Sequence, residues 1–240
     1  MHLLEVKGLC KAYHKKVVIT NIDLHVTTGE IVGLLGPNGA GKTTTFYSIL
    51  GLIRPERGSV YLDKQDIGML PLFKRATMGI SYLPQEPSIF RKLSVEDNLR
   101  AVLEIKGLQR EEIDTEVFRL LKEFNLEPFS KRNGYKLSGG ERRRTEIARA
   151  LATGPTFILF DEPFAGIDPL AIIELKKMLI YLKEKGLGII ITDHNVRDTL
   201  SITDRAYIIS NGEILDEGTP DKLIAAPKVK EVYLGEEFRL

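Results

Sequence analysis

The sequence has a single cysteine, no excess of charge of either sign and no long apolar run, and each lack excludes a class of protein. Cys10 has no partner for a disulfide within the chain, which is typical of proteins of the cytoplasm. The 34 basic residues are balanced by 33 acidic ones, so the net charge is +1. A dedicated nucleic-acid-binding protein normally carries a basic excess, so we expect no nucleic-acid partner.

Membrane insertion is also not expected. The longest stretches without Asp, Glu, Lys or Arg, such as 31–41 and 43–53, have 11 residues, whereas a spanning helix needs about 20 apolar ones. The first residues contain Glu5 and Lys7 and no long apolar segment, so we expect no secretory signal. Any membrane role of this chain would therefore depend on a partner.

Strand and helix patterns alternate along most of the 240 residues. Helices are expected from Lys42 to about Leu52 and after the capping pair Asp168-Pro169, and Asn211-Gly212 indicates a hairpin. Apolar or β-branched runs predict strands at 3–6, 17–26, 31–35, 157–160 and 188–192. Buried strands that alternate with helices predict an α/β fold with a mostly parallel sheet covered on both faces.

The middle of the chain has a different character. Ser94 and Asp97 form the ends of a capping-box pattern, and apolar residues then recur at helical spacing in two segments. The apolar faces consist of Val95, Leu99 and Val102, and of Ile113, Val117, Leu120 or Leu121, and Phe124. We therefore predict one cassette, 1–240, in which a helical subdomain at 93–135 is inserted between 1–92 and 136–240.

A glycine-rich loop lies between the strand expected at 31–35 and the following helix. It matches the P-loop pattern G-x-x-x-x-G-K-[ST], in which backbone amides and a helix N-terminus surround phosphate oxygens. In that pattern Lys42 reaches the β- and γ-phosphates and the Thr43 hydroxyl binds Mg²⁺. The candidate phosphate-binding residues are Gly36, Pro37, Asn38, Gly39, Ala40, Gly41, Lys42, Thr43 and Thr44.

Two acids follow the apolar run 157–160. A buried strand that ends in an acid places the carboxylate at the edge of the sheet where ligands bind in open α/β folds. We expect Asp161 to hold Mg²⁺, mostly through water, and Glu162 to polarise an attacking water molecule. Without a P-loop on the same chain, a solvated acidic turn would be the simpler interpretation.

A second glycine pair begins another helix at Ser138-Gly139-Gly140 and forms a second anion-binding site. Preceded by Leu137, it resembles the signature motif of the ATP-binding cassette (ABC) ATPases. Glu141 stands where that family usually has glutamine. The resemblance covers nearly the whole chain and implies the P-loop NTPase fold of the family, with an N-terminal antiparallel β subdomain.

The same resemblance implies roles for further residues. Tyr13 corresponds to the aromatic residue that stacks on adenine, and Gln85 to the glutamine that senses Mg²⁺ and the membrane partner. Residues 165–168 match the D-loop, and His194 matches the histidine that contacts the γ-phosphate. Catalysis would then fall to Lys42, Glu162 and His194, with ATP and Mg²⁺ bound.

One P-loop and one signature motif on a single chain imply half of each of two composite sites. In this family Ser138 and Gly140 of one copy face the P-loop of another, with Gly139 between them in the same motif. The motif count therefore predicts a homodimer with ATP held between its two chains.

Five segments, 82–99, 137–144, 161–169, 191–197 and 232–240, resemble the lipopolysaccharide-export branch of the family. That branch implies a dimer under two membrane subunits on the cytoplasmic face of the inner membrane. Phe90 and Arg91, beside Gln85, would receive a helix of each membrane subunit, although Phe90 could instead pack under the helical subdomain. The alternatives are the ATPase of a branched-chain amino-acid importer and a soluble ABC protein such as an iron–sulfur assembly factor.

Overall fold

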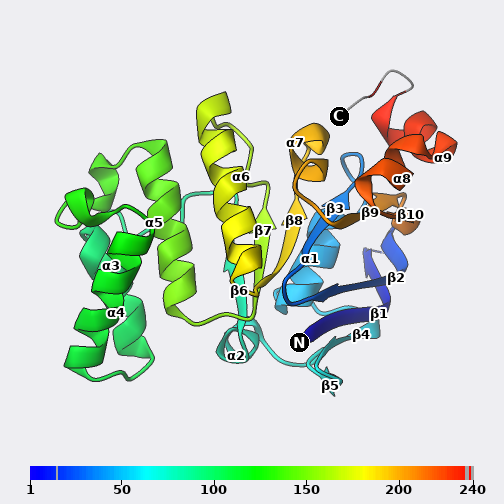
Figure 1. The fold of residues 1–240 in the computed structure, drawn as a ribbon. Helices are drawn as coiled ribbons and strands as arrows, with labels where there is room; N and C mark the ends of the chain where they lie inside the picture. The colour runs from blue at the N-terminus through cyan, green and yellow to red at the C-terminus, as the bar shows by residue number, and fades with distance from the viewer. Residues whose placement is uncertain (15, 236–237, 239–240) are drawn as a thin grey trace. The chain divides into compact units, whose positions relative to one another are not determined.

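The structure, a computed structural model, describes residues 1–14, 16–235 and 238. The chain forms two compact units, one made of Met1–Tyr82 with Thr156–Leu240 and the other of Leu83–Pro155 (Figure 1). Four residues of the resemblance at 232–240, namely Glu236, Glu237, Arg239 and Leu240, lie outside the described residues.

The first unit begins with an antiparallel sheet in the order β2-β1-β4-β5. Its strands are β1 (Leu3–Tyr13), β2 (Lys16–Thr27), β4 (Arg57–Leu62) and β5 (Gln65–Asp66). Register shifts interrupt the β1–β2 pairing between Val6 and Ala12, so β1 continues well beyond the predicted segment 3–6 and ends at Tyr13. This sheet agrees with the antiparallel β subdomain that the resemblance implies.

The second sheet of this unit has six strands in the order β10-β9-β3-β8-β7-β6. The strands β3 (Ile31–Leu35), β7 (Phe157–Asp161) and β8 (Gly188–Thr192) are buried at every residue, which is the pattern of parallel strands covered on both faces. β3 is parallel to β8 and β9, and β7 is parallel to β8. The others are β6 (Ile80–Leu83), β9 (Arg205–Ser210) and the antiparallel β10 (Glu213–Gly218).

Helix α1 (Lys42–Leu50) follows β3 and packs between the two sheets. Phe46, Ile49 and Leu50 share one core with residues of both sheets, such as Leu4 and Ile190. A smaller core lies around Leu35, Ile208 and Val229. The remaining helical segments of this unit are α2 (Leu72–Thr77), α6 (Pro169–Glu184), α7 (Val196–Leu200), α8 (Pro220–Ala225), α9 (Pro227–Val229) and a π-turn (Lys230–Leu234).

The second unit is helical. It consists of α3 (Val95–Ile105), α4 (Arg110–Glu123) and α5 (Gly139–Ala152), with short 3₁₀ turns at Glu127–Phe129 and Gly134–Lys136. The Ser94 hydroxyl accepts from the Asp97 amide at 3.0 Å, so the predicted N-cap of α3 is present. The apolar positions Val95, Leu99, Ile113, Val117 and Leu120 are all buried.

The predicted α/β fold class is confirmed, but the structure adds elements that the sequence reading did not include. It missed β4, β5, β6, α2 and α7: the three strands are buried at no more than two residues each, and the two helices are shorter than two turns. The helical unit also extends beyond the predicted 93–135, since α5 packs against α3 and α4. The signature motif, placed by the sequence in segment 136–240, thus belongs to the helical unit.

Candidate active site

The P-loop connects β3 to α1, and its two terminal glycines allow its tight path. A Cβ on Gly36 would lie 2.0 Å from the carbonyl oxygen of Ile209, so the loop can approach β9 this closely only with glycine there. Gly41 has φ +109° and is the N-cap of α1, and a Cβ on it would lie 2.5 Å from Ile19. The amide of Gly212, in the β9–β10 hairpin, donates to the Ala40 carbonyl at 3.0 Å. The loop is therefore held on both sides by neighbouring backbone.

Lys42 lies inside this loop. Its ammonium group donates to the carbonyl oxygens of Gly36 at 2.7 Å and Pro37 at 3.0 Å. Burial lowers the pKa of Lys42, and the charges of Glu162 and Asp161 oppose that shift. The lysine and the two acids predicted for catalysis and metal binding are therefore electrostatically coupled.

Asp161 ends β7 and has two hydrogen-bond donors. The hydroxyl of Thr192, its register partner on β8, donates to Oδ1 at 2.7 Å, and the hydroxyl of Tyr82 donates to Oδ2 at 3.2 Å. Burial raises the pKa of Tyr82, so this phenol stays a donor. The sequence analysis missed both donors. Thr192 could have been identified, because it is the last residue of the strand predicted at 188–192.

Glu162 and His194 meet at the same edge of the sheet. His194 Nε2 lies 2.7 Å from Glu162 Oε2. Glu162 adopts a left-handed conformation with φ +46°, which turns the chain sharply after β7. The Glu162 side chain is 18% exposed and that of His194 is 53% exposed, so a solvent molecule can reach the pair. A carboxylate beside an imidazole is suited to accept and relay a proton.

The described residues fit a magnesium ion bound mainly by phosphate and water. Mg²⁺ prefers oxygen ligands and in phosphate sites takes only one or two from the protein. Thr43 is exposed in the first turn of α1 and Asp161 supplies a carboxylate next to Lys42. Among the described residues no group of three or more His, Cys, Asp or Glu could form a cage for a metal. The site thus resembles one completed by a bound nucleotide.

Tyr13 ends β1 with 39% of its surface exposed, and the ammonium group of Lys11 lies 5.4 Å from its ring centre. An exposed ring beside a cation is available for stacking on a base. Asp168 is the N-cap of α6, where its carboxylate accepts from the amides of Leu170 and Ala171 at 3.0 Å. The D-loop residues therefore begin a helix, as the Asp-Pro pair predicts.

In the helical unit, Ser138 is the N-cap of α5 and forms a capping box with Glu141. The Ser138 amide donates to Glu141 Oε2 at 2.8 Å, and the Glu141 amide donates to the Ser138 hydroxyl at 3.3 Å. Arg132 lies 3.2 Å from the Glu141 carboxylate. Because glutamine can also occupy this capping position, the departure at Glu141 preserves the cap and adds an ion pair.

Gln85, Phe90 and Arg91 are exposed on the helical unit, and Phe90 is 48% exposed. The backbone of Phe90 is fixed from both sides by Asn98, which accepts from its amide at 2.8 Å and donates to its carbonyl at 3.1 Å. The guanidinium of Arg149 lies 4.9 Å from the Phe90 ring. Phe90 is therefore a rigidly held, half-exposed aromatic residue rather than a core residue.

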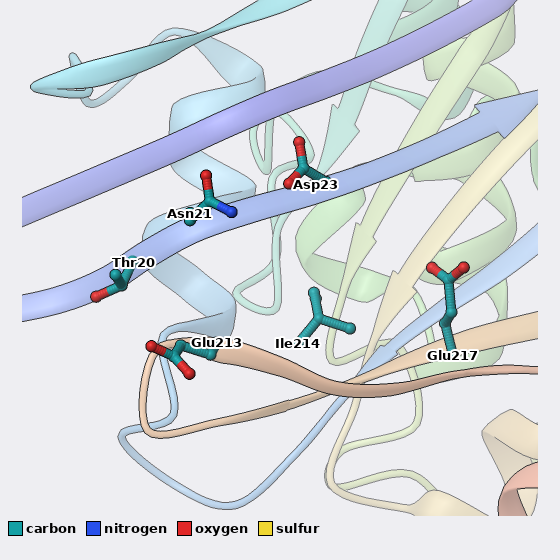
Figure 2. A pocket seen from close by; sticks show the side chains of 6 residues that line it. All are labelled: Thr20, Asn21, Asp23, Glu213, Ile214 and Glu217. Atoms are coloured by element: carbon teal, nitrogen blue, oxygen red, sulfur yellow. The ribbon is translucent and has the colours of Figure 1, made fainter.

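A further hollow, of about 380 Å³, contains none of the predicted site residues. Figure 2 shows Thr20, Asn21 and Asp23 of β2 across from Glu213, Ile214 and Glu217 of β10. It adjoins the P-loop support, because the Thr20 amide donates to the carbonyl oxygen of Gly212 at 2.7 Å. Its three acids repel phosphate, so this hollow is no second nucleotide pocket.

The structure therefore brings Lys42, Asp161, Glu162 and His194 together in the first unit. Gln85, Ser138, Gly139 and Gly140 belong to the second unit. A P-loop with an acid pair and a histidine at the carboxyl edge of a parallel sheet defines a P-loop NTPase.

Comparison with known proteins narrows this class. Residues 19–165 match the family model described as "ABC transporter", and the chain belongs to this family of ATP-binding proteins. It is 53% identical to the lipopolysaccharide export system ATP-binding protein LptB of Escherichia coli K12, over 241 aligned positions that cover 100% of both chains.

Two solved structures extend the comparison. The ADP conformation of MJ1267, an ATP-binding cassette of an ABC transporter, has a TM-score of 0.89 at 28% identity, covering 98% of this chain and 100% of the other. The cassette MJ0796, a dimer in a post-hydrolysis state with ADP and phosphate, has a TM-score of 0.78 at 27% identity, covering 90% and 98%. The predicted family, fold and ATPase class are confirmed, and the chain is a nucleotide-binding ABC ATPase.

The part of the chain that the structure describes contains no helix with the length and apolar character needed to cross a bilayer.

Proposed function

We propose that this chain is the ATP-hydrolysing subunit of a lipopolysaccharide exporter and acts as a homodimer beneath two membrane subunits, on the cytoplasmic face of the inner membrane. The observation that carries the export assignment is the 53% identity to LptB along the whole length of both chains. Such full-length similarity includes segments, such as 82–99, of which ATP chemistry fixes only a few residues.

The hydrolytic role rests on the geometry at the edge of the sheet. Glu162 accepts a proton from the attacking water, and His194, 2.7 Å away, orients the water and the γ-phosphate. Lys42 neutralises charge that develops on the phosphate oxygens. Thr43, Asp161 and Gln85 would hold Mg²⁺, which would supply further charge neutralisation when bound. Tyr13 stacks on the adenine ring.

The signature motif completes the site of the other copy. Ser138 and Gly140 sit at the N-terminus of the 14-residue helix α5, where backbone amides favour an anion. We propose that these groups bind the γ-phosphate held by the P-loop of the partner chain. This arrangement is supported by one P-loop and one signature motif per chain, and by the dimer reported for the cassette MJ0796.

A pull-down from detergent-solubilised membranes of the native bacterium tests the export assignment. Tagged chain should co-purify with two membrane subunits whose loss stops lipopolysaccharide from reaching the outer membrane. Recovery of an amino-acid permease instead would support the importer alternative. Recovery of soluble iron–sulfur assembly proteins, without any membrane subunit, would support the assembly-factor alternative. Either of these outcomes overturns the proposal.

A further inference from the structure

The carboxylate of Asp193 is enclosed between the two loops that carry the proposed catalytic pair. Asp193 directly precedes His194 and is only 1% exposed. Its Oδ2 accepts from the backbone amide of Phe164 at 2.8 Å, and its Oδ1 accepts from the amide of Asn195 at 2.7 Å. One side chain thus joins the loop after β7 to the loop after β8.

Strands β7 and β8 are paired up to their last residues, Asp161 and Thr192. The Thr192 hydroxyl donates to Asp161, and the amide of Glu162 donates to the Thr192 carbonyl at 2.7 Å. Beyond this point the chains leave the sheet, because Glu162 turns into the left-handed region. Besides the Glu162–His194 contact itself, the Asp193–Phe164 hydrogen bond connects the two loops, and backbone pairing does not supply it.

The loop after β8 is also fixed on its other side. The Asn195 side chain caps α7 by accepting from the amide of Asp198 at 3.2 Å, and Asp198 lies 2.5 Å from Lys176 on α6. His194 therefore lies between a capped helix and the Asp193 connection.

Burial of a carboxylate is unfavourable, and burial raises the pKa of Asp193, an effect that the amides of Asn195, Phe164 and His194 and the His194 charge oppose. The two short hydrogen bonds from backbone amides compensate part of the cost of burying a carboxylate at this position. Aspartate is suited to it because its two oxygens accept from two amides at once, whereas asparagine offers a single oxygen and an NH₂ group that faces one amide donor.

We propose that Asp193 is a positioning residue that fixes the spacing between Glu162 and His194 by connecting their two loops. It does not touch the substrate; it holds the two groups that do. This inference rests on the proposed roles of Glu162 and His194, because a displacement of about 1 Å in such a pair can lower turnover about 100-fold.

The test compares Asp193→Asn with a matched control, Asp204→Asn. Asp204 also accepts from a backbone amide, that of Ile31 at 2.8 Å. Both residues lie where parallel strands of the same sheet begin, at the end opposite the catalytic pair. Asp193→Asn should lower kcat for ATP about 10- to 100-fold, with KM and ADP affinity within about twofold of wild type. Asp204→Asn should keep kcat within about twofold.

The double variant Asp193→Asn with Glu162→Gln separates positioning from general damage. If Asp193 acts through Glu162 and His194, the Asp193→Asn substitution should lower kcat only slightly further in a protein that already carries Glu162→Gln. An equal fold-loss in both backgrounds would overturn the proposal, and so would wild-type kcat in Asp193→Asn. Wild-type turnover by Glu162→Gln alone would instead overturn the role of Glu162 in the proposed function.

Hydrogen exchange in the wild-type protein tests the connection even if Asp193→Asn fails to fold. The Phe164 amide should exchange as slowly as amides of β7 and β8. Exchange at the rate of exposed loop amides would overturn the proposal.

Discussion

The ammonium nitrogen of Lys42 lies 2.7 Å from the carbonyl oxygen of Gly36, so the cation of the P-loop is bonded to the first residue of the same loop. A second hydrogen bond, to the Pro37 carbonyl, holds the side chain there; burial lowers the pKa of Lys42, while the charges of Glu162 and Asp161 favour its charged form. The lysine is thus positioned for phosphate by the loop itself, and this arrangement leads to the first of five predictions.

Replacement of Lys42 by alanine should weaken ATP binding about 10- to 100-fold, because charge-assisted hydrogen bonds to phosphate are lost, and it should abolish measurable turnover. Equilibrium binding of a fluorescent ATP analogue and phosphate release measure the two effects. Lys228→Ala, an exposed lysine on α9, is the control and should match wild type. Wild-type affinity in Lys42→Ala would contradict the assignment.

Replacement of Glu162 by glutamine should retain ATP binding but lower kcat about 100-fold or more, because the amide cannot accept the proton of water. ATP should then accumulate between two chains, and light scattering in the presence of ATP and Mg²⁺ should report a dimer. Glu213→Gln, at the hollow of Figure 2, is the control and should hydrolyse ATP normally. A monomer under these conditions would argue against the ATP-bound homodimer.

Replacement of Phe90 by alanine should leave the ATPase activity of the isolated chain unchanged but weaken co-purification with the membrane subunits. The reason is that a rigid, half-exposed aromatic residue is suited to dominate a contact. Phe118→Ala removes a more exposed phenylalanine of α4 and should leave assembly intact. Equal recovery of membrane subunits with both variants would exclude Phe90 as a docking residue.

Arg75 on α2 should be among the most destabilising positions to replace. It is 1% exposed and donates to the carbonyls of Ser48 and Ile49 at the end of α1, and to those of Leu70 and Gly68. Burial lowers its pKa to about 10, so it stays charged at neutral pH. Arg75→Ala leaves these carbonyls unpaired and should cost about 4 kcal/mol in urea unfolding, with Arg75→Lys between it and wild type.

The matched control for Arg75 is Arg54→Ala, which removes an exposed arginine near the end of α1 and should change the free energy of unfolding by less than about 0.5 kcal/mol. A similarly small effect of Arg75→Ala would show that α1 does not depend on this cap.

Tyr233→Phe should stabilise the protein by about 1 kcal/mol, because its buried hydroxyl has no hydrogen-bond partner among the described residues. Burial raises the pKa of Tyr233 to about 12. Between pH 10 and 12 the folded state therefore keeps a proton that the unfolded state releases, so the free energy of unfolding falls by about 2–3 kcal/mol as pH rises.

The phenylalanine variant should lack that alkaline loss, as chemical unfolding at several pH values can measure. Tyr135→Phe, which alters an exposed phenol, should behave as wild type. A loss of stability in Tyr233→Phe at neutral pH would mean that the hydroxyl is paired.

Local patterns were enough to predict much of the fold. The buried runs at 31–35, 157–160 and 188–192 became β3, β7 and β8, because a strand covered on both faces must be apolar throughout. Asn211-Gly212 formed the hairpin, since both residues adopt positive φ. β5 has two exposed residues, β6 is buried only at its two ends and α2 is shorter than two helical turns, so none of them carries a continuous apolar run or a full helical period.

The features of the site can likewise be separated into those that local sequence determines and those that the tertiary structure determines. Sequence alone determined the residue types of the P-loop, the acid pair after β7 and the signature, because glycine, lysine and carboxylates are required by phosphate and metal chemistry at fixed local spacing. It also determined the caps at Ser94, Ser138 and Asp168, which act within three residues.

Only the tertiary structure decided which distant groups meet. Thr192 bonds to Asp161 although they are 31 residues apart, and Asp193 bonds to the amide of Phe164 although they are 29 residues apart. These contacts follow from the parallel register of β7 and β8, which no local periodicity encodes, because the pairing of strands is decided by their common burial. The catalytic pair of Glu162 and His194 depends on the same register.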